Sequence, residues 1–183
     1  MTTSAAGESG PPPAVPGDDK DWTWVLTQPC PGCGFDPATV SVEHVPGLVR
    51  ANATAWQDIL ARPDVATRPS PEVWSPLEYA CHVRDVFVLF DRRLHRMLDE
   101  DDPLFANWNQ DETAVEQRYW AQDPSTVAAE LTAAAETVAD SFAGVQPEQW
   151  TRRGRRSDGA AFTVESFARY FVHDPQHHLA DVA

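Results

Sequence analysis

The chain has 183 residues, and its 14 basic and 28 acidic side chains give a formal net charge of -14. This length suits one domain, or one domain with a tail, and the acidic balance disfavours binding to nucleic acid or to an anionic membrane surface. No uncharged apolar run approaches the roughly 20 residues that cross a bilayer. With three cysteines and an N-terminus unlike a signal peptide, the chain is expected to be cytoplasmic and to bind neither nucleic acid nor membranes.

The first 41 residues differ in composition from the rest. Residues 1–21 are rich in Gly, Pro, Ser and Asp without an apolar period, which predicts a disordered tail. Residues 22–41 form an extension that contains two tryptophans and a CxxC turn from Cys30 to Cys33. The folded domain is therefore expected over residues 42–183.

Helical periodicity begins after residue 44. Apolar residues spaced by three or four positions predict a first helix over residues 45–61. The second helix has the strongest start signal in the chain, with Ser75 as N-cap, Pro76 at the first helical position and Glu78 completing a capping box. This helix is expected to run to the acidic cluster at residues 99–102.

The second half of the chain predicts two more helices. A long aromatic connector, helical in part over residues 113–120, precedes a third helix that starts after Asp123 and ends near Gly144. Thr163 can cap the fourth helix. Because four helical segments occur without an alternating strand pattern, the sequence predicts an all-α fold, an antiparallel four-helix bundle.

Histidines on two of these helices predict a metal site. His173 and His177 are four residues apart, so both imidazoles project from one helix face, about 40° apart. His82, at an interior position of the second helix, is the natural third ligand, and three histidines leave a coordination position open for water or substrate. The alternative is that His82 is an ordinary core histidine and that the HxxxH pair lies on a surface by chance.

Neighbouring groups are assigned supporting roles. Asp85 lies one turn after His82, where it can accept a hydrogen bond from a ligand imidazole or act as a general base; alternatively it pairs with a surface arginine. His178 lies about 100° from His177 around the helix, so it is expected beside the metal site or on the surface. Asp174 and Asp181 are expected to be solvated, although Asp174 is close enough to support a ligand.

These residues resemble the DinB-like superfamily, which comprises bacterial metal-binding four-helix bundles that include YfiT-like proteins and thiol-dependent transferases and isomerases. The matching pieces are Trp74-Ser75 followed by Glu78 and His82, together with the segment from His173 to Leu179. The resemblance covers residues 42–183. It implies that His82, His173 and His177 bind a divalent metal, with zinc or nickel expected.

The resemblance also implies a reaction. In characterised relatives the metal binds a low-molecular-weight thiol as thiolate, which attacks an electrophile, so the chain is expected to be a mycothiol-type S-transferase or isomerase. Its expected partners are a small-molecule thiol and an electrophilic substrate, and a homodimer is a further expectation. Two alternatives stay open: a hydrolase that uses metal-activated water, and a non-catalytic metal-binding bundle associated with stress.

Three local features lie outside this pattern. Pro175 sits between the two helix histidines and either kinks the last helix or restarts it, and a kinked continuous helix is favoured. Cys30 and Cys33 can form a second metal site with Cys81 or His44, or a redox pair, or a plain turn. A basic loop before the last helix can receive an anionic substrate or a cofactor carboxylate, or it is a solvated loop; its residues are Arg152, Arg153, Arg155 and Arg156.

Overall fold

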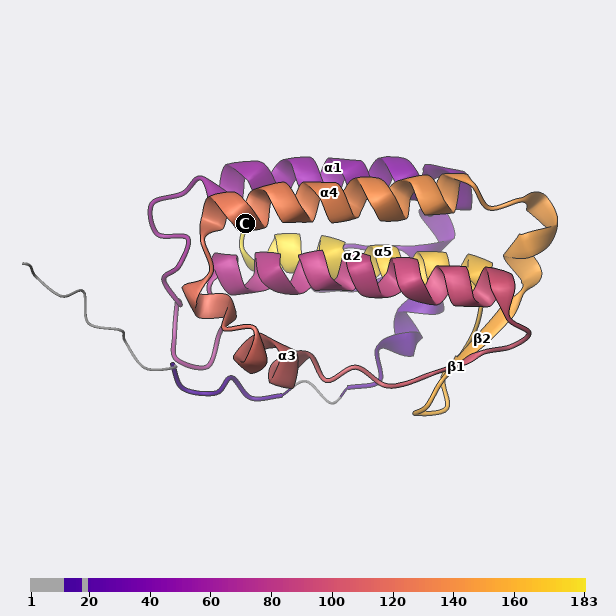
Figure 1. The fold of residues 1–183 in the computed structure, drawn as a ribbon, viewed down its shortest axis with the longest axis horizontal. Coiled ribbons are helices and arrows are strands. Elements are labelled where there is room, and N and C mark those ends of the chain that lie inside the picture. The colour runs from indigo at the N-terminus through magenta and orange to yellow at the C-terminus, as the bar shows by residue number, and fades with distance from the viewer. Residues whose placement is uncertain (1–11, 18–19) are drawn as a thin grey trace, which may run out of the picture.

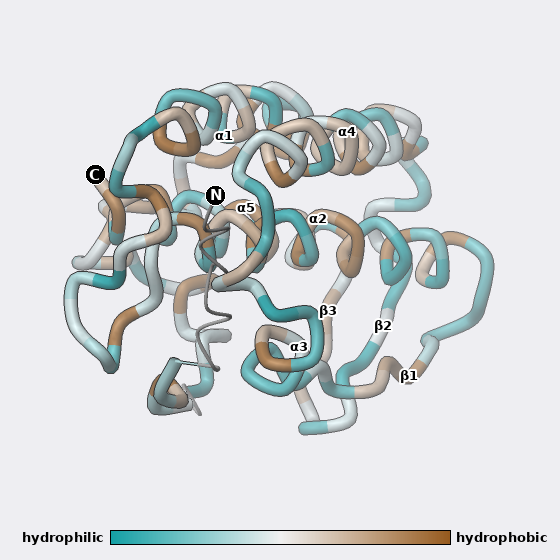
Figure 2. The backbone as a smooth tube through the Cα atoms, turned by 60° about the vertical axis from the view of Figure 1, so that its left-hand side comes forward, coloured by the Kyte–Doolittle hydropathy of each residue, from teal (hydrophilic) through white to brown (hydrophobic). Residues whose placement is uncertain are grey.

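The structure, a computed structural model, describes residues 12–17 and 20–183. Four long helices form a bundle: α1 (Val45–Leu60), α2 (Pro76–Asp99), α4 (Pro124–Ala143) and α5 (Val164–Asp181). Helices α1 and α4 make one layer, and α2 and α5 make the other (Figure 1). In α1 and α4 the hydrophobic, brown parts of the tube lie on the side toward α2 and α5 (Figure 2). The predicted all-α bundle is therefore confirmed.

The predicted helix starts are confirmed by their hydrogen bonds. Ser75 Oγ accepts the backbone N–H of Glu78, and the Glu78 carboxylate accepts the N–H of Ser75 at 2.9 Å. The side chain of Asp123 accepts the N–H of Thr126 at 2.8 Å. Each cap satisfies a donor that the first helical turn leaves without a partner, which fixes where the helix begins.

The bundle contains helices that run in both directions, as predicted, but helices that follow one another along the chain do not always alternate in direction. Helices α2 and α4 run in the same direction, opposite to α1 and α5 (Figure 1). The chain achieves this because the connector over residues 100–123 returns it to the end of the bundle where α2 began. The connector carries the short helix α3 (Gln110–Glu116) and a 3-10 turn at Tyr119–Ala121, in place of one helix over 113–120.

A small three-stranded sheet, which the sequence did not predict, lies at one end of the bundle. Strand β2 (Arg153–Arg156) pairs in parallel with β1 (Leu104–Phe105) and antiparallel with β3 (Ala161–Thr163). Strands of two to four residues, one of them composed of Arg and Gly, carry no detectable period of two. The sheet places the basic loop beside the beginning of the aromatic connector.

The N-terminal extension packs onto the bundle. It contains three 3-10 turns, at Trp22–Leu26, Pro37–Thr39 and Val42–His44, and the first of these contacts α5. Val25 and Phe35 are buried and join the hydrophobic core. The extension therefore forms part of the surface above α5.

The predicted disordered tail falls partly outside the described residues, at positions 1–11 and 18–19. Of the remainder, Pro13 accepts a hydrogen bond from Arg68 at 2.7 Å and Val15 packs against the core. These contacts place part of the tail against the folded domain.

Helix α5 is continuous through Pro175, as favoured from the sequence. Proline lacks an N–H, so Pro175 cannot donate a hydrogen bond to the carbonyl of Phe171. The carbonyl of Pro175 itself accepts a hydrogen bond from the buried Asn52 side chain at 2.8 Å. Continuity keeps the helical spacing between His173 and His177. Within the described part of the chain, no helix is both long enough and apolar enough to span a membrane.

Candidate metal centres

The C-terminal half of α5 carries potential metal ligands on two faces. Successive residues of an α-helix are rotated by about 100°, so His173 and His177 share one face, and Asp174 and His178 share another. Each pair has the spacing that brings two side chains together. The structure completes each pair with residues from a different part of the chain.

The first cluster contains His82, Asp174 and His178. One donor atom of each residue lies within 4.8 Å of the others. Nε2 of His82 is 3.3 Å from Oδ1 of Asp174, and Nε2 of His178 is 3.7 Å from the same oxygen. The buried His82 nitrogens and Asp174 Oδ1 have no hydrogen-bond partner among the described residues. Three converging donor atoms of this kind fit a divalent cation with part of its coordination sphere open.

The second nitrogen of His178 supports the same interpretation. Nδ1 of His178 lies 2.9 Å from the carboxylate of Asp181. A carboxylate at the far nitrogen orients a ligand imidazole and fixes its tautomer, so that Nε2 faces the cluster. Burial by itself raises the pKa of Asp174. The nearby imidazoles, of which His82 has the largest effect, lower the pKa by more, to about 2. The carboxylate is therefore in the ionised form that a metal requires.

The first cluster lies beside a cavity whose volume is about 600 Å³. Asp174 and His178 line this cavity, whereas His82 is fully buried and is covered by Trp108, which stacks on its ring at 5.3 Å between centroids. Much of the cavity wall is aromatic: Trp22, Trp74, Tyr79, Phe90, Trp108 and Tyr170. A small molecule in this cavity can contact the half-buried side chains of Asp174 and His178.

The second cluster contains Cys30, Cys33, His173 and His177. Their donor atoms also lie within 4.8 Å of one another. Sγ of Cys30 is 3.6 Å from Nδ1 of His177. Burial is the main cause that raises the pKa of Cys33 to about 11, so this thiol is a poor nucleophile at neutral pH.

The predicted ligand set is therefore divided between two clusters. His82 does not join His173 and His177; its partners are Asp174 and His178. His178, which was expected beside the metal site or on the surface, lies with its ring 4.8 Å from that of His82. The spacing of Asp174 and His178, identical to that of the histidine pair, was the signal that could have identified them.

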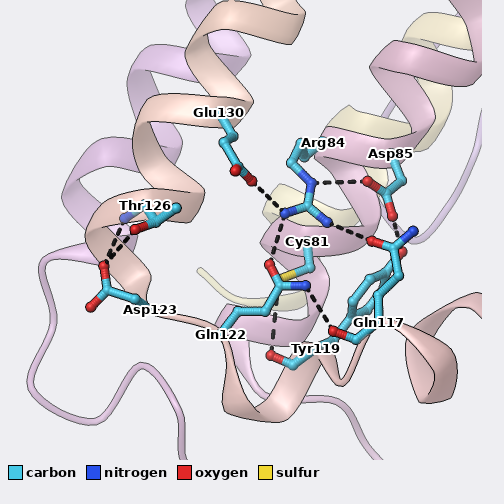
Figure 3. A network of polar contacts seen from close by, with 9 residues as sticks. All are labelled: Cys81, Arg84, Asp85, Gln117, Tyr119, Gln122, Asp123, Thr126 and Glu130. Carbon is cyan, nitrogen blue, oxygen red and sulfur yellow. Dashed lines mark hydrogen bonds and ion pairs between the residues drawn. The ribbon is translucent and has the colours of Figure 1, made fainter.

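Asp85 lies in a separate polar network, away from both clusters. Its carboxylate accepts hydrogen bonds from the Tyr119 hydroxyl and from Arg84, which also contacts Glu130 (Figure 3). Asp85 does not line the cavity. Its contacts therefore match the alternative of pairing with an arginine, and they tie α2 to the connector and to α4.

The four arginines of the basic loop have different surroundings. Arg152 donates to the carbonyls of Met97 and Glu100, both at 2.6 Å. Arg155 pairs with Asp102, and Arg153 is an exposed residue of β2. Arg156 alone among the four lines the cavity, where it donates to Asp158 and to the Tyr170 hydroxyl.

The cavity also contains a cation that the sequence analysis did not identify. Arg93 is buried and donates to the carbonyl of Ala106 at 2.8 Å. Among the described residues no carboxylate pairs with it. Burial, and then the charge of Arg156, lower the pKa of Arg93 to about 10, so it stays protonated at neutral pH. Arg93 lies in the same cavity as Arg156, whose charge is paired with that of Asp158.

The suggested partners of the CxxC turn do not reach it. Cys81 is buried and its Sγ lies 3.9 Å from the carbonyl of Tyr119, and His44 is exposed at the N-cap of α1. The donor atoms beside the two cysteines come instead from His173 and His177, which were expected to bind a metal together with His82.

Comparisons with known proteins agree with this architecture. The family model described as DinB superfamily matches residues 47–182. A solved structure, YfiT from Bacillus subtilis, superposes with a TM-score of 0.72 and 16% sequence identity, covering 79% of this chain and 86% of that one. That protein is described as "a probable metal-dependent hydrolase with an unusual four-helix bundle topology". No curated protein matches the sequence.

Proposed function

Because the chain belongs to the DinB superfamily, we propose that it is a metal-dependent hydrolase whose active site is the cluster of His82, Asp174 and His178. The observation that carries this proposal is the convergence of two imidazoles and one carboxylate within 4.8 Å beside a cavity of about 600 Å³. Two histidines with one carboxylate are a ligand set of hydrolytic zinc sites, in which a further position binds water.

A divalent ion held by these residues would supply Lewis acidity and lower the pKa of water that it binds. The protein's own contribution is to hold the three donors and to exclude solvent from one side of them. Trp74 and Trp108 cover the ring of His82, and Asp181 orients His178 through its Nδ1. These contacts position the donors before a substrate arrives.

One buried cation in the cavity wall indicates the class of substrate. Arg93 is a buried guanidinium without a carboxylate partner among the described residues, whereas Arg156 in the same cavity is paired with Asp158. A buried cation is stabilised by a paired anion. We therefore propose that the substrate carries a carboxylate or a similar anion, which pairs with Arg93 while the bond to be cleaved lies near Asp174 and His178.

Thiol transfer is the second candidate function, and the size and lining of the cavity favour it. About 600 Å³, with Asn107, Asn109 and Gln110 in the wall, can hold a polar thiol such as mycothiol beside an electrophile. Cys81 is buried, and Cys30 and Cys33 lie in the other cluster, so the reactive sulfur would come from a co-substrate.

A parallel assay separates the two functions. The full chain, loaded with Zn²⁺ or Ni²⁺, is tested for hydrolysis of para-nitrophenyl hydrogen succinate and for conjugation of mycothiol to monochlorobimane. Asp174→Asn is expected to lower the hydrolytic rate by more than the roughly 10–100-fold typical of residues that only support a ligand. Asp91→Asn, which changes a carboxylate distant from both clusters, is the matched control.

The two reactions and their dependence on Asp174 distinguish the hydrolase from the transferase. Ester hydrolysis that depends on Asp174 supports the hydrolase. Mycothiol conjugation that depends on Asp174, without ester hydrolysis, replaces the hydrolase by the transferase. Equal rates in the wild type and in Asp174→Asn for both reactions would contradict both.

A further inference from the structure

We propose that Cys30, Cys33, His173 and His177 form a closed, four-coordinate zinc site that holds the N-terminal extension on helix α5. The site is separate from the cluster to which the hydrolase is assigned, and it does not depend on that assignment. Two cysteines and two histidines whose donor atoms lie within 4.8 Å of one another are a ligand set of structural zinc.

The spacing of the donors fits a tetrahedral ion. Zinc binds cysteine sulfur at about 2.3 Å and histidine nitrogen at about 2.0 Å, so tetrahedral angles place sulfur and nitrogen about 3.5 Å apart. The observed separation between Cys30 Sγ and His177 Nδ1 is 3.6 Å. His173 presents a buried Nε2 without a hydrogen-bond partner among the described residues.

The backbone of the CxxC turn is shaped to present two sulfurs. Gly34 N–H donates to the carbonyl of Cys30 and Cys30 N–H donates to the carbonyl of Phe35, both at 2.8 Å. Gly34 has a φ of 73°, a conformation that glycine adopts without strain. At Gly32 a Cβ atom would lie 3.0 Å from Cε1 of His177, so glycine allows the turn to approach the helix closely.

Groups around the ligands hold the imidazoles in place. Trp22 packs against the rings of His173 and His177 at 5.4 and 5.1 Å between centroids, and Phe35 packs edge-on against His173. Nε2 of His177 lies 3.8 Å from the carboxylate of Asp181, on the side away from Cys30. A ligand histidine with a carboxylate near its second nitrogen is the usual arrangement at zinc sites.

The charge and coordination of such a site suit a structural role. Two thiolates balance the charge of one Zn²⁺, which allows burial among apolar side chains, and binding releases the two thiol protons. Four protein ligands leave no position for a substrate. The ion would instead join residues separated by 147 positions, and it would hold Trp22 in the wall of the catalytic cavity.

Cobalt substitution of the full chain tests the proposal. Co²⁺ bound by thiolates is expected to give a sulfur-to-metal charge-transfer band in the near ultraviolet and the intense visible bands of a tetrahedral site. The double variant Cys30→Ser/Cys33→Ser is expected to lose the charge-transfer band and one equivalent of zinc per chain. Cys81→Ala, which removes the buried cysteine outside the cluster, is expected to keep both.

His82→Ala separates this proposal from the proposed function. This variant removes a ligand of the first cluster only, so it is expected to keep the charge-transfer band whether or not the hydrolase assignment is correct. Loss of hydrolysis with the band intact supports two separate sites. Loss of the band in His82→Ala would overturn the proposal, because it would show that His82 belongs to the cysteine site.

A measurement on the unmodified chain covers the case in which the double cysteine variant does not fold. Titration of the zinc-loaded wild type with a mercurial reagent is expected to release one zinc per chain as two thiols react. Release of no zinc during modification of these thiols would overturn the proposal. So would formation of a disulfide between Cys30 and Cys33 under mild oxidation without loss of zinc, which is the behaviour of a redox pair.

Discussion

His177 and His178 are consecutive residues of α5, yet their imidazoles belong to different clusters. His177 Nδ1 lies 3.6 Å from Cys30 Sγ, whereas His178 Nε2 lies 3.7 Å from Asp174 Oδ1. Because adjacent residues are rotated by about 100° around the helix axis, one turn and a half of α5 can supply ligands to two centres. The chemistry proposed for this chain depends on that division.

Replacement of His82 by leucine is expected to abolish metal binding at the first cluster and to destabilise the metal-free protein. His82 is fully buried, and its Nε2 lies 3.3 Å from the Asp174 carboxylate, whose pKa it lowers. Leucine leaves this carboxylate without that partner, so the free energy of unfolding of the metal-free protein is expected to fall by about 1–3 kcal/mol. Urea unfolding with and without chelator measures both effects. A gain of stability in the metal-free variant would contradict this account.

Asp181→Asn is expected to weaken both centres. The Asp181 carboxylate lies 2.9 Å from His178 Nδ1 and 3.8 Å from His177 Nε2. Loss of a carboxylate that supports a ligand histidine typically lowers metal affinity about 10–100-fold. Competition with a chromophoric zinc chelator measures the two affinities, with Asp91→Asn as control. An effect on one centre only would limit the role of Asp181 to that centre.

Arg93→Leu is expected to raise KM for an anionic ester about 10-fold and to leave KM for neutral para-nitrophenyl acetate unchanged. The physical reason is the loss of a charge-assisted contact to the substrate anion. Steady-state kinetics with the two esters measure the difference. Arg155→Leu is the matched control, because Arg155 lies in the same basic loop as Arg156 but pairs with Asp102 outside the cavity. Equal changes with both esters would show that Arg93 acts through the fold alone.

The sequence was sufficient to predict the helices, because their start signals are local. Ser75, Asp123 and Thr163 cap the first turns of their helices within three or four residues of chain, so no tertiary information is needed. The small sheet was not predictable in the same way. Its strands are short and depend on the approach of Leu104 to Arg155 across the fold.

The ligand sets could be predicted only in part. The spacing of His173 and His177 correctly places two imidazoles on one helix face, but it does not show what lies opposite that face. The extension brings Cys30 there from 147 residues away, and His82 lies with the other pair, Asp174 and His178. Such long-range placement depends on the packing of Trp22 and Phe35, which no local pattern encodes.

Glu78→Gln is expected to lower the free energy of unfolding by about 1–3 kcal/mol at neutral pH. The buried Glu78 carboxylate accepts hydrogen bonds from Arg68 and from Ser75. Burial raises the pKa of Glu78, but these hydrogen bonds and the charge of Arg68 outweigh it, so the pKa lies below its ordinary value. The ionised form is therefore favoured by folding.

The sign of the pH dependence follows from that direction. The stabilisation is complete above the unfolded-state pKa of about 4.3 and is lost as the pH falls through the lower pKa of the folded state. Urea unfolding as a function of pH should show the wild type and Glu78→Gln converging in acid. A difference between them that stays constant from neutral pH into acid would contradict the ionised pair.

The most direct test of the two-centre account is anomalous X-ray diffraction at the zinc edge from crystals of the full chain grown with zinc. The account predicts two separate peaks per chain, one bound by Cys30, Cys33, His173 and His177, and the other by His82, Asp174 and His178. A single peak bound by His82, His173 and His177 together would contradict it.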